Sequence, residues 1–192
     1  MEEPLIKFAQ WFAEAQSCAA IREPTAMTLA TATPEGKPSA RIVLLKAFDA
    51  QGFVFYTNLQ SRKGTELAAN PQAALVFYWM ALDKQIRIEG RVSPVNDAEA
   101  DAYFATRERH KQAGAWASLQ SQPLNSREQL IDRVKELEAQ YEGRPIPRPP
   151  HWSGLRLAPD SIEFWFQREA RLHEREIYIR AGESWQHQLL YP

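Results

Sequence analysis

The sequence predicts a mainly β protein of the α+β class, in which a β-barrel is surrounded by peripheral helices. Stretches rich in β-branched and aromatic residues recur along the chain, while helical periodicity is confined to a few segments. Strands and helices do not alternate regularly, which favours a barrel over a doubly wound parallel sheet. Residues 1–192 are expected to form a single domain, because one domain commonly holds about 100–200 residues.

An amphipathic helix is predicted over residues 5–18. Its apolar positions recur three or four residues apart, at Leu5, Phe8, Trp11, Phe12 and Ala15. A helix with one apolar face needs another element to pack on.

Five strands are predicted in the next part of the chain. They cover residues 27–31, 41–45, 53–57, 73–79 and 85–92. A turn at 33–36 predicts that the first two strands form a hairpin, and a second turn at 49–52 precedes the third strand. A short helix is predicted at 61–69, with Arg62 and Lys63 in its first turn.

Two helices and an extended connector are predicted before the last strands. One helix covers 97–107 and begins at a capping aspartate, and a longer surface helix covers 126–141. The proline-rich residues 144–150 exclude both helix and central strand. Four short strands are then predicted at 152–157, 161–166, 172–179 and 185–190, with turns at 158–160 and 181–182.

The composition excludes several classes of protein. Lys and Arg total 23 against 24 for Asp and Glu, so no nucleic-acid partner is indicated. No apolar run approaches the length of a membrane span, and residues 1–20 lack the pattern of a secretory leader. The single cysteine excludes an internal disulfide, which fits a reducing compartment. We therefore expect a cytoplasmic protein with no membrane partner.

Common catalytic motifs are missing from the sequence. The 8 glycines form neither a G-x-G-x-x-G fingerprint nor a phosphate-binding loop of the G-x-x-x-x-G-K type. The 4 histidines show no paired helical spacing, and there is no G-x-S-x-G elbow. We expect no metal site and no serine hydrolase.

A candidate phosphate site lies at residues 56–63. A strand ends there in hydroxyl residues and a helix begins, with Arg62 and Lys63 at its positive end. From these residues alone a solvated helix end is the simpler interpretation. Arg41 and Lys46 bracket an apolar strand and, five residues apart, are expected on opposite faces, so they cannot serve one small anion together.

Five blocks, in order along the chain, resemble the pyridoxamine 5'-phosphate oxidase family, and the resemblance extends over residues 11–192. These blocks are Arg41-Ile42-Val43-Leu44-Leu45-Lys46, Phe55-Tyr56-Thr57-Asn58 with Ser61-Arg62-Lys63, Gly114-Ala115-Trp116-Ala117-Ser118 with Gln120-Ser121, Ile162-Glu163-Phe164-Trp165, and Arg171-Leu172-His173. The resemblance implies an FMN-binding split β-barrel that forms a homodimer, with two FMN molecules in clefts at the subunit interface.

The resemblance also implies which residues bind the cofactor. From one subunit these are Arg41, Ile42, Val43, Leu44, Leu45, Lys46, Tyr56 and Thr57 along the flavin, Arg62 and Lys63 at its phosphate, and Gln85 near the ring. From the other subunit Gln120, Ser121, Trp165 and Arg175 would complete the site. A phosphate monoester carries roughly two negative charges near neutral pH, so several charge-assisted donors are required.

A second set of residues is implied for the substrate, a small phosphorylated pyridine. Lys46, Tyr103 and Arg107 would hold its phosphate, with Lys111 beside them, while Arg171, Leu172 and His173 would lie over the flavin. The implied reaction is oxidation of the C4' amine or alcohol by hydride transfer to flavin N5, which yields pyridoxal 5'-phosphate. Dioxygen then gives hydrogen peroxide, and the amine also releases ammonia. Arg171 and His173 would position substrate and handle protons at near-neutral pH.

The sequence departs from the family pattern in three places. Glu108, His110 and Lys111 replace a proline, a small or acidic residue and a phosphate-binding serine, and Glu174 replaces an aspartate. The chain also begins close to its first predicted helix, so we expect no substrate-covering segment before it. Two alternatives stay open: an oxidase of the same fold that acts on another aromatic, as in phenazine pathways, and a non-catalytic protein that binds flavin or pyridoxal phosphate.

Overall fold

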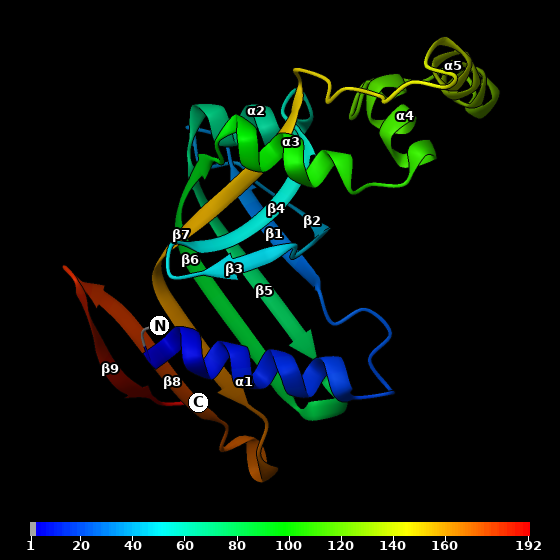
Figure 1. The fold of residues 1–192 in the computed structure, drawn as a ribbon. Helices are drawn as coiled ribbons and strands as arrows, with labels where there is room; N and C mark the ends of the chain where they lie inside the picture. The colour runs from blue at the N-terminus through cyan, green and yellow to red at the C-terminus, as the bar shows by residue number, and fades with distance from the viewer. Residues whose placement is uncertain (1–2) are drawn as a thin grey trace.

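Nine antiparallel strands form one strongly curled sheet in the computed structural model, which describes residues 3–192 (Figure 1). The strands are β1 (Ala26–Ala32), β2 (Pro38–Leu44), β3 (Ala47–Asp49), β4 (Gly52–Asn58), β5 (Gln72–Trp79), β6 (Lys84–Pro94), β7 (Trp152–Phe166), β8 (Glu174–Ala181) and β9 (Ser184–Leu190). Their order is β2-β1-β5-β6-β7-β4-β3, and β8 and β9 continue the sheet from the other end of β7. The predicted barrel class is confirmed.

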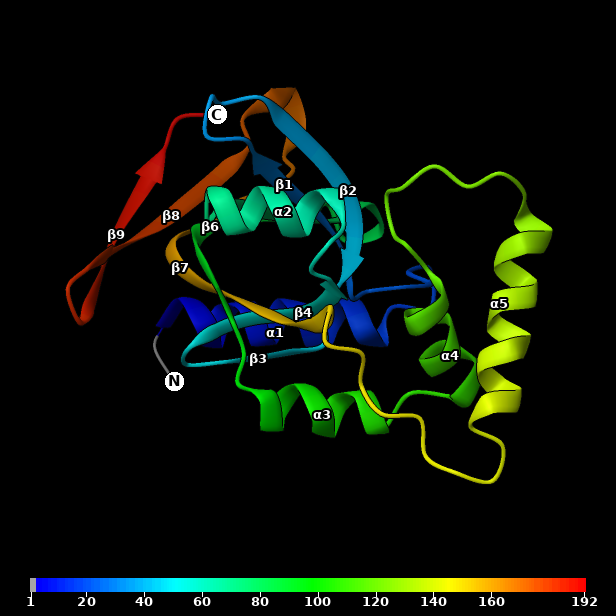
Figure 2. The same ribbon diagram turned by 90° about the horizontal axis from the view of Figure 1, so that it is seen from above.

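The helices lie outside this sheet. They are α1 (Glu3–Ser17), α2 (Arg62–Ala69), α3 (Asp97–Ala105), α4 (Arg109–Ala117) and α5 (Arg127–Gln140), with short 3-10 turns η1 (Met80–Leu82) and η2 (Glu169–Arg171). Figures 1 and 2 show the α4–α5 pair and the β8–β9 hairpin projecting from opposite sides of the barrel. Among the described residues no helix is both long and apolar enough to span a membrane. Met1 and Glu2, at the start of the region expected to hold no leader, lie outside the description.

The N-terminal helix α1 covers the open side of the curled sheet, as its apolar face requires (Figure 1). Phe8 is fully buried, and its ring lies 4.8 Å from that of Phe53 and 5.4 Å from that of Phe77. Burying a phenylalanine of this kind stabilises a fold by about 1.5–3 kcal/mol. The helix therefore closes the main core, which leaves the opposite end of the barrel to the functional residues.

The predicted turn at 158–160 is wrong. β7 runs without a break from Trp152 to Phe166, and the irregularity is a β-bulge where its partner β6 shifts register between Glu89 and Gly90. A Cβ on Gly90 would lie 2.0 Å from the carbonyl oxygen of Ala158, so only glycine allows this approach. Pro159 lacks an N–H and is tolerated at the bulge. The Ala-Pro-Asp sequence therefore marks a bulge rather than a chain reversal.

Helix α4 and strand β3 were not predicted from the sequence. α4 has no side-chain cap at Glu108 and contains Gly114, so it lacks the usual signals of a helix start. It forms because Ala113 is fully buried in a second core with Phe104, Ile146 and Trp152, against which α5 also packs. Packing therefore decides this helix. The remaining predicted elements are present with small changes at their ends.

Candidate functional site

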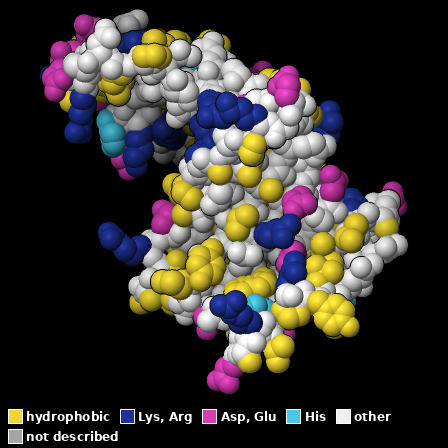
Figure 3. All heavy atoms as spheres, turned by 180° about the vertical axis from the view of Figure 1, so that it is seen from behind, with side chains coloured by type: hydrophobic (Ala, Val, Ile, Leu, Met, Phe, Trp, Pro, Cys, Tyr) yellow, Lys and Arg dark blue, Asp and Glu magenta, His cyan; other side chains and the backbone are white. Residues whose placement is uncertain are grey.

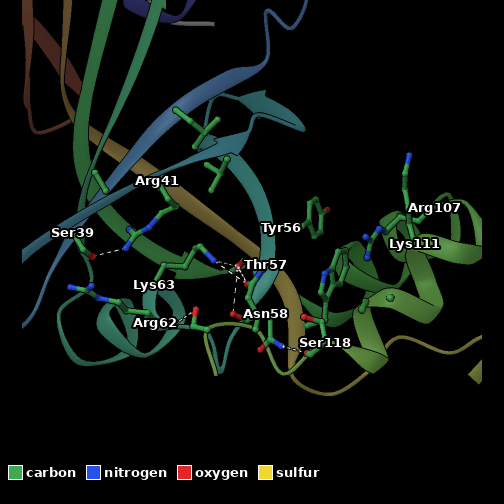
Figure 4. A pocket seen from close by; sticks show the side chains of 18 of the residues that line it. Ser39, Arg41, Tyr56, Thr57, Asn58, Arg62, Lys63, Arg107, Lys111 and Ser118 are labelled. Atoms are coloured by element: carbon green, nitrogen blue, oxygen red, sulfur yellow. Dashed lines mark hydrogen bonds between the residues drawn. The ribbon is translucent and has the colours of Figure 1, made fainter. Parts of the chain in front are cut away.

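A cleft of about 830 Å³ lies between the sheet and the α4 region (Figure 4). It is lined by Ser39, Ala40, Arg41, Ile42, Val43, Tyr56, Thr57, Asn58, Arg62, Lys63, Arg107, His110, Lys111, Gly114, Ala115, Ser118, Gln120, Ser121 and Trp152. Figure 3 shows a hollow between the body of the molecule and the helical projection, with Lys and Arg side chains around it. A cavity with so many cations among hydroxyl and aromatic groups suits an anionic aromatic ligand.

One group of cations, here called the Arg62 cluster, consists of Arg41, Arg62 and Lys63. Arg62 is the first residue of α2, and the buried Ser61 caps the helix by accepting a hydrogen bond from the Gly64 amide at 3.4 Å. The helix start therefore brings the positive end of its dipole and two cations to the cleft wall. This is the arrangement expected of a phosphate seat.

Close packing holds the start of α2 in place. A Cβ on Gly64 would lie 2.2 Å from the Leu59 carbonyl oxygen, which only glycine permits. Lys63 Nζ donates to Thr57 Oγ1 at 3.2 Å and to Gln120 Oε1 at 3.0 Å. Burial, and after it the charge of Arg41, lower the pKa of the Lys63 ammonium. Lys63 is therefore a desolvated cation whose charge an anion would stabilise.

Behind the cluster lies Glu66, a carboxylate with only 6 % of its surface exposed. It accepts hydrogen bonds from Ser39 at 2.6 Å, from Arg62 Nε at 2.8 Å and from Thr31, and Arg41 Nη2 lies 3.3 Å from it. Burial alone would raise the pKa of Glu66, but the hydrogen bonds from Ser39, Thr31 and Arg62 outweigh it and lower the pKa to about 2. The carboxylate is therefore ionised, and both arginines are bound to it.

A second group, here called the Arg107 cluster, consists of Arg107, His110 and Lys111. The Arg107 guanidinium lies 4.8 Å from the Trp152 ring, and burial lowers its pKa. Its Nη1 is buried and, among the described residues, is the one buried side-chain nitrogen or oxygen without a hydrogen-bond partner. An unpaired buried donor costs about 1–3 kcal/mol, and a bound anion would remove that cost.

Three stacked aromatic rings separate the two clusters. Tyr56 lies 3.9 Å from Tyr103 and 5.1 Å from Trp152, with nearly parallel planes. Burial raises the pKa of Tyr56 to about 12, so the phenol is neutral at physiological pH. Figure 4 shows Arg41 and Lys63 on one side of Tyr56 and the α4 residues on the other. The cleft therefore has two separated places for negative charge.

Three of the residues that depart from the family pattern, Glu108, His110 and Lys111, lie at the Arg107 end of the cleft. Lys111 Nζ is 3.1 Å from one Glu108 oxygen, and His110 Nε2 is 3.4 Å from the other. Both pairs are exposed, so each contributes little to stability. A ligand in the cleft can therefore replace Glu108 as the ion-pair partner of Lys111 at a small cost in free energy.

Several predicted flavin residues do not line this cleft. Gln85, Trp165 and Arg175 stand opposite one another on β6, β7 and β8, and we call them the Trp165 row. The His173 ring lies 4.6 Å from the Trp165 ring, and Arg175 Nε donates to Glu163 at 2.7 Å. The row occupies the end of β7 remote from Trp152, so one chain does not bring it to its own cleft. Gln85, expected in the flavin site of its own subunit, therefore lies with the two residues expected from the other subunit.

The structure corrects three further placements. β2 begins at Pro38 and ends at Leu44, so Lys46 lies beyond it, and the expectation that Arg41 and Lys46 lie on opposite faces of one strand is wrong. Lys46 is exposed and does not line the cleft, while the Leu45 side chain is 3 % exposed and belongs to the core. The Leu45 amide donates to the Thr25 carbonyl at 2.9 Å, and the side chain packs in the main core.

Gln120 and Ser121 require the third correction. The resemblance implied that they come from the second subunit, but Gln120 contacts Lys63 and Ser121 Oγ accepts from the Arg62 amide at 3.2 Å within the same chain. Ser121 reaches this position with a left-handed backbone, φ 73°. The loop after α4 folds back over α2, which sequence spacing does not reveal.

Two functional residues were not identified from the sequence. Glu66 carries a recognisable signal, since it lies four residues after Arg62 on a helix, where opposite charges pair. Trp152 belongs to the second core and also lines the cleft between the two clusters, and no sequence pattern indicated this second role. Its role depends on the long-range stacking that places Tyr103 and Tyr56 beside it. No group of three metal-binding side chains occurs in residues 3–192.

Two family models match the chain. Residues 13–141 match the model described as "Pyridoxamine 5'-phosphate oxidase", and residues 152–192 match "Pyridoxine 5'-phosphate oxidase C-terminal dimerisation region". The second match contains Trp165, Arg171, His173 and Arg175. Together the two matches cover most of the sequence.

Named relatives and solved structures agree with these matches. A pyridoxine/pyridoxamine 5'-phosphate oxidase of Myxococcus xanthus is 58% identical over 99% of this chain and 92% of its own length. One of Rubrobacter xylanophilus is 55% identical over 99% and 87%. The crystal structure of PhzG from Burkholderia lata with tetrahydrophenazine-1-carboxylic acid superposes with a TM-score of 0.93 at 38% identity, covering 100% of this chain and 94% of that one. An FMN-binding protein of Nostoc punctiforme, at 18% identity and a TM-score of 0.75, covers 97% and 96% and supports the fold.

Proposed function

This chain belongs to the pyridoxamine 5'-phosphate oxidase family, and from that membership we propose that it is an FMN-dependent oxidase that forms pyridoxal 5'-phosphate. Its substrates are pyridoxamine 5'-phosphate or pyridoxine 5'-phosphate, and dioxygen is the acceptor, giving hydrogen peroxide and, from the amine, ammonia. The observation that carries the proposal is the pair of cation clusters on either side of one aromatic stack. Two clusters suit two phosphates, one on the cofactor and one on the substrate.

The Arg62 cluster fits the phosphate of FMN. Three cations, the positive end of α2 and the Thr57 hydroxyl converge on one wall of the cleft. A phosphate monoester with roughly two negative charges needs several such donors. Ile42, with 64 % of its surface exposed, and Val43 provide an apolar surface nearby for the ring system. The donor set therefore suits a phosphorylated flavin.

The Arg107 cluster fits the phosphate of the substrate. The unpaired Nη1 of Arg107 offers a buried donor. Lys111 adds a cation at the position where the family pattern has serine. The Trp152 ring, which stacks with Tyr103, lines the cleft next to Arg107. A phosphorylated pyridine can pair its phosphate with Arg107 while its ring lies toward the flavin position.

A homodimer completes the active site in this proposal. Within one chain the Trp165 row lies far from the cleft, but the region that contains it matches a dimerisation model. A second copy can therefore bring its Trp165, Arg171 and His173 to the cleft of the first. We also propose that residues 1–192 act as one domain, since β7 of the C-terminal match pairs with β4 and β6 of the N-terminal match.

Bound FMN would accept two electrons from the substrate and pass them to dioxygen, while the protein orients the reactants. Arg107 and Lys111 would anchor the substrate phosphate, which fixes the distance of the C4' carbon from the flavin. The Arg168 amide donates to His173 Nδ1 at 3.2 Å, so the neutral imidazole carries its proton on Nε2. His173 Nε2 therefore serves as a hydrogen-bond donor to the substrate, and Arg171 positions the substrate beside it.

Anaerobic reduction of the flavin tests the proposal. The purified protein should be yellow or take up added FMN, and pyridoxamine 5'-phosphate should bleach it without oxygen and release peroxide with oxygen. Arg171→Ala should slow the bleaching while FMN stays bound, whereas Arg62→Ala should chiefly weaken FMN binding. Protein that binds no FMN contradicts the proposal, and FMN-loaded protein that no substrate bleaches supports a non-catalytic flavin-binding role.

A second candidate substrate class is supported by the likeness to PhzG. Lys111 and Glu174 depart from the oxidase pattern, and Lys111, which lines the cleft, can change the shape of the substrate site. A panel of pyridine phosphates and phenazine precursors, read by peroxide formation, separates the two classes. Lys111→Ser should raise turnover of pyridoxine 5'-phosphate only if Lys111 has shifted specificity away from it.

A further inference from the structure

Glu66 lies behind the Arg62 cluster and does not line the cleft itself. Its buried carboxylate receives donors from three elements: Thr31 on β1, Ser39 and Arg41 on β2, and Arg62 on α2 itself. All of these donors belong to the protein itself, which is the requirement for a pre-organised anion site.

The Arg41 guanidinium is held on nearly all sides. Nη1 donates to the Leu29 carbonyl at 3.2 Å and to Thr31 Oγ1 at 2.6 Å, and Nη2 donates to Ser39 Oγ at 2.5 Å and to Glu66 at 3.3 Å. Four of its five N–H donors are therefore directed at the protein. The Arg41 guanidinium is therefore a fixed positive charge beside the cleft, with one N–H donor left free.

Arg62 depends on Glu66 more strongly than Arg41 does. Its side chain is 55 % exposed, and its Nε donates to the Glu66 carboxylate at 2.8 Å. An exposed arginine without that partner samples many rotamers. The carboxylate therefore converts a mobile surface cation into one with a defined direction, and leaves both Nη groups available to an anion.

We infer that Glu66 is a positioning residue for the cofactor phosphate, which orients Arg41 and Arg62 so that the cleft prefers FMN over the unphosphorylated flavin, riboflavin. The inference rests on the proposed function, because it takes FMN as the ligand. Glu66 touches neither cofactor nor substrate. It acts through the two arginines.

Two opposing effects decide the outcome of removing the carboxylate. A negative charge behind the cluster repels phosphate, so its loss would favour binding. That charge is already paired with two arginines, however, and three cations with one carboxylate still leave two net positive charges for a dianion. The loss of orientation is not offset in this way. Without Glu66, the Arg62 side chain must be ordered when the ligand binds, and the entropy cost of that ordering weakens binding. Orientation therefore outweighs repulsion.

The test compares FMN and riboflavin binding to flavin-free wild type and Glu66→Gln, measured by quenching of flavin fluorescence. We expect the Kd for FMN to rise about tenfold, as for ordering one or two long side chains on binding, and the Kd for riboflavin to stay within about twofold. Glu176→Gln is the matched control, because Glu176 is another partly buried carboxylate, paired with Lys7 at 2.5 Å against α1. It should leave both constants unchanged.

Other outcomes are equally informative. Equal weakening of FMN and riboflavin would show a general structural role, and unchanged or tighter FMN binding would show that repulsion dominates; either result overturns the inference. If Glu66→Gln does not fold, Thr31→Val removes a donor to Glu66 and a partner of Arg41 with little change in shape, and a smaller loss confined to FMN is expected. A wild type that does not distinguish FMN from riboflavin would instead contradict the proposed function.

Discussion

Replacing Arg107 with methionine should stabilise the ligand-free protein and impair substrate binding at the same time. The guanidinium packs over Trp152, but its Nη1 is buried without a partner. Methionine can keep much of the packing and carries no donor that needs one. Because the two effects have opposite signs, the variant tests whether Arg107 serves ligand binding and not the stability of the fold.

The size of each effect follows from these contacts. Removing an unsatisfied buried donor recovers about 1–3 kcal/mol. Loss of the cation–π contact with Trp152 costs about 0.5–2 kcal/mol, of which a sulfur–aromatic contact restores about 0.3–1.5 kcal/mol. The net gain is about 1 kcal/mol, which in a chain of 192 residues raises the melting temperature by about 2–4 °C. Loss of charge-assisted bonds to the substrate phosphate, about 1.5–3 kcal/mol, should weaken substrate binding about 10- to 150-fold.

The assay is thermal unfolding of flavin-free protein at one fixed concentration, followed by titration of FMN-loaded protein with pyridoxamine 5'-phosphate. Arg109→Met is the control, because the Arg109 guanidinium donates to the carbonyls of Glu138, Tyr141 and Arg144 and its loss should lower the melting temperature. FMN affinity should not change in Arg107→Met. A melting temperature lowered as in the control, or unchanged substrate affinity, would refute the reasoning.

Three further predictions concern the start of α2. Gly64→Ala places a Cβ against the Leu59 carbonyl, so it should destabilise the fold by at least about 1–3 kcal/mol in chemical denaturation and weaken FMN binding; retained FMN affinity would mean that α2 does not set the phosphate site. Because the Lys63 pKa is lowered, FMN affinity should fall as pH rises toward 10.5, and Lys63→Arg should abolish that fall; an identical pH profile in the variant would count against a role for Lys63. The pKa of Glu66 is about 2 in the fold against 4.5, so its ionised form stabilises the fold above pH 4.5, and that stabilisation is lost as pH falls toward 2. Urea midpoints of wild type and Glu66→Gln should therefore converge below pH 4.5, and a gap that stays constant would exclude this linkage.

Most strands and helices could be predicted because their signals are local. The spacing of Leu5, Phe8 and Phe12 predicts α1, and the turn at 33–36 predicts the β1–β2 hairpin, which the register Ala32↔Pro38 confirms. The errors occurred where distant packing overrides local signals. α4 lacks a cap and depends on the second core, and β7 passes through Pro159 because Gly90 on β6 allows a bulge.

The site could be predicted only in part for the same reason. The strand end and helix start at 56–63 identify Arg62 and Lys63, since a helix N-terminus attracts anions whatever surrounds it. Glu66 was overlooked because its importance comes from Thr31 and Ser39, which lie far away in the sequence. The same holds for Trp152, whose place in the cleft depends on stacking against Tyr56 and Tyr103.

By itself the sequence determined the barrel class, the order of the elements and the motif residues of the family, because periodicity, turn residues and motif strings are properties of neighbouring residues. Only the tertiary structure decided which of those residues meet. It joined Gln120 and Ser121 to the Arg62 cluster of their own chain, left Arg107 with an unpaired buried donor, and placed the Trp165 row at the far end of β7. Contacts between distant segments depend on how the sheet curls and how loops close over it, and no local pattern encodes that geometry.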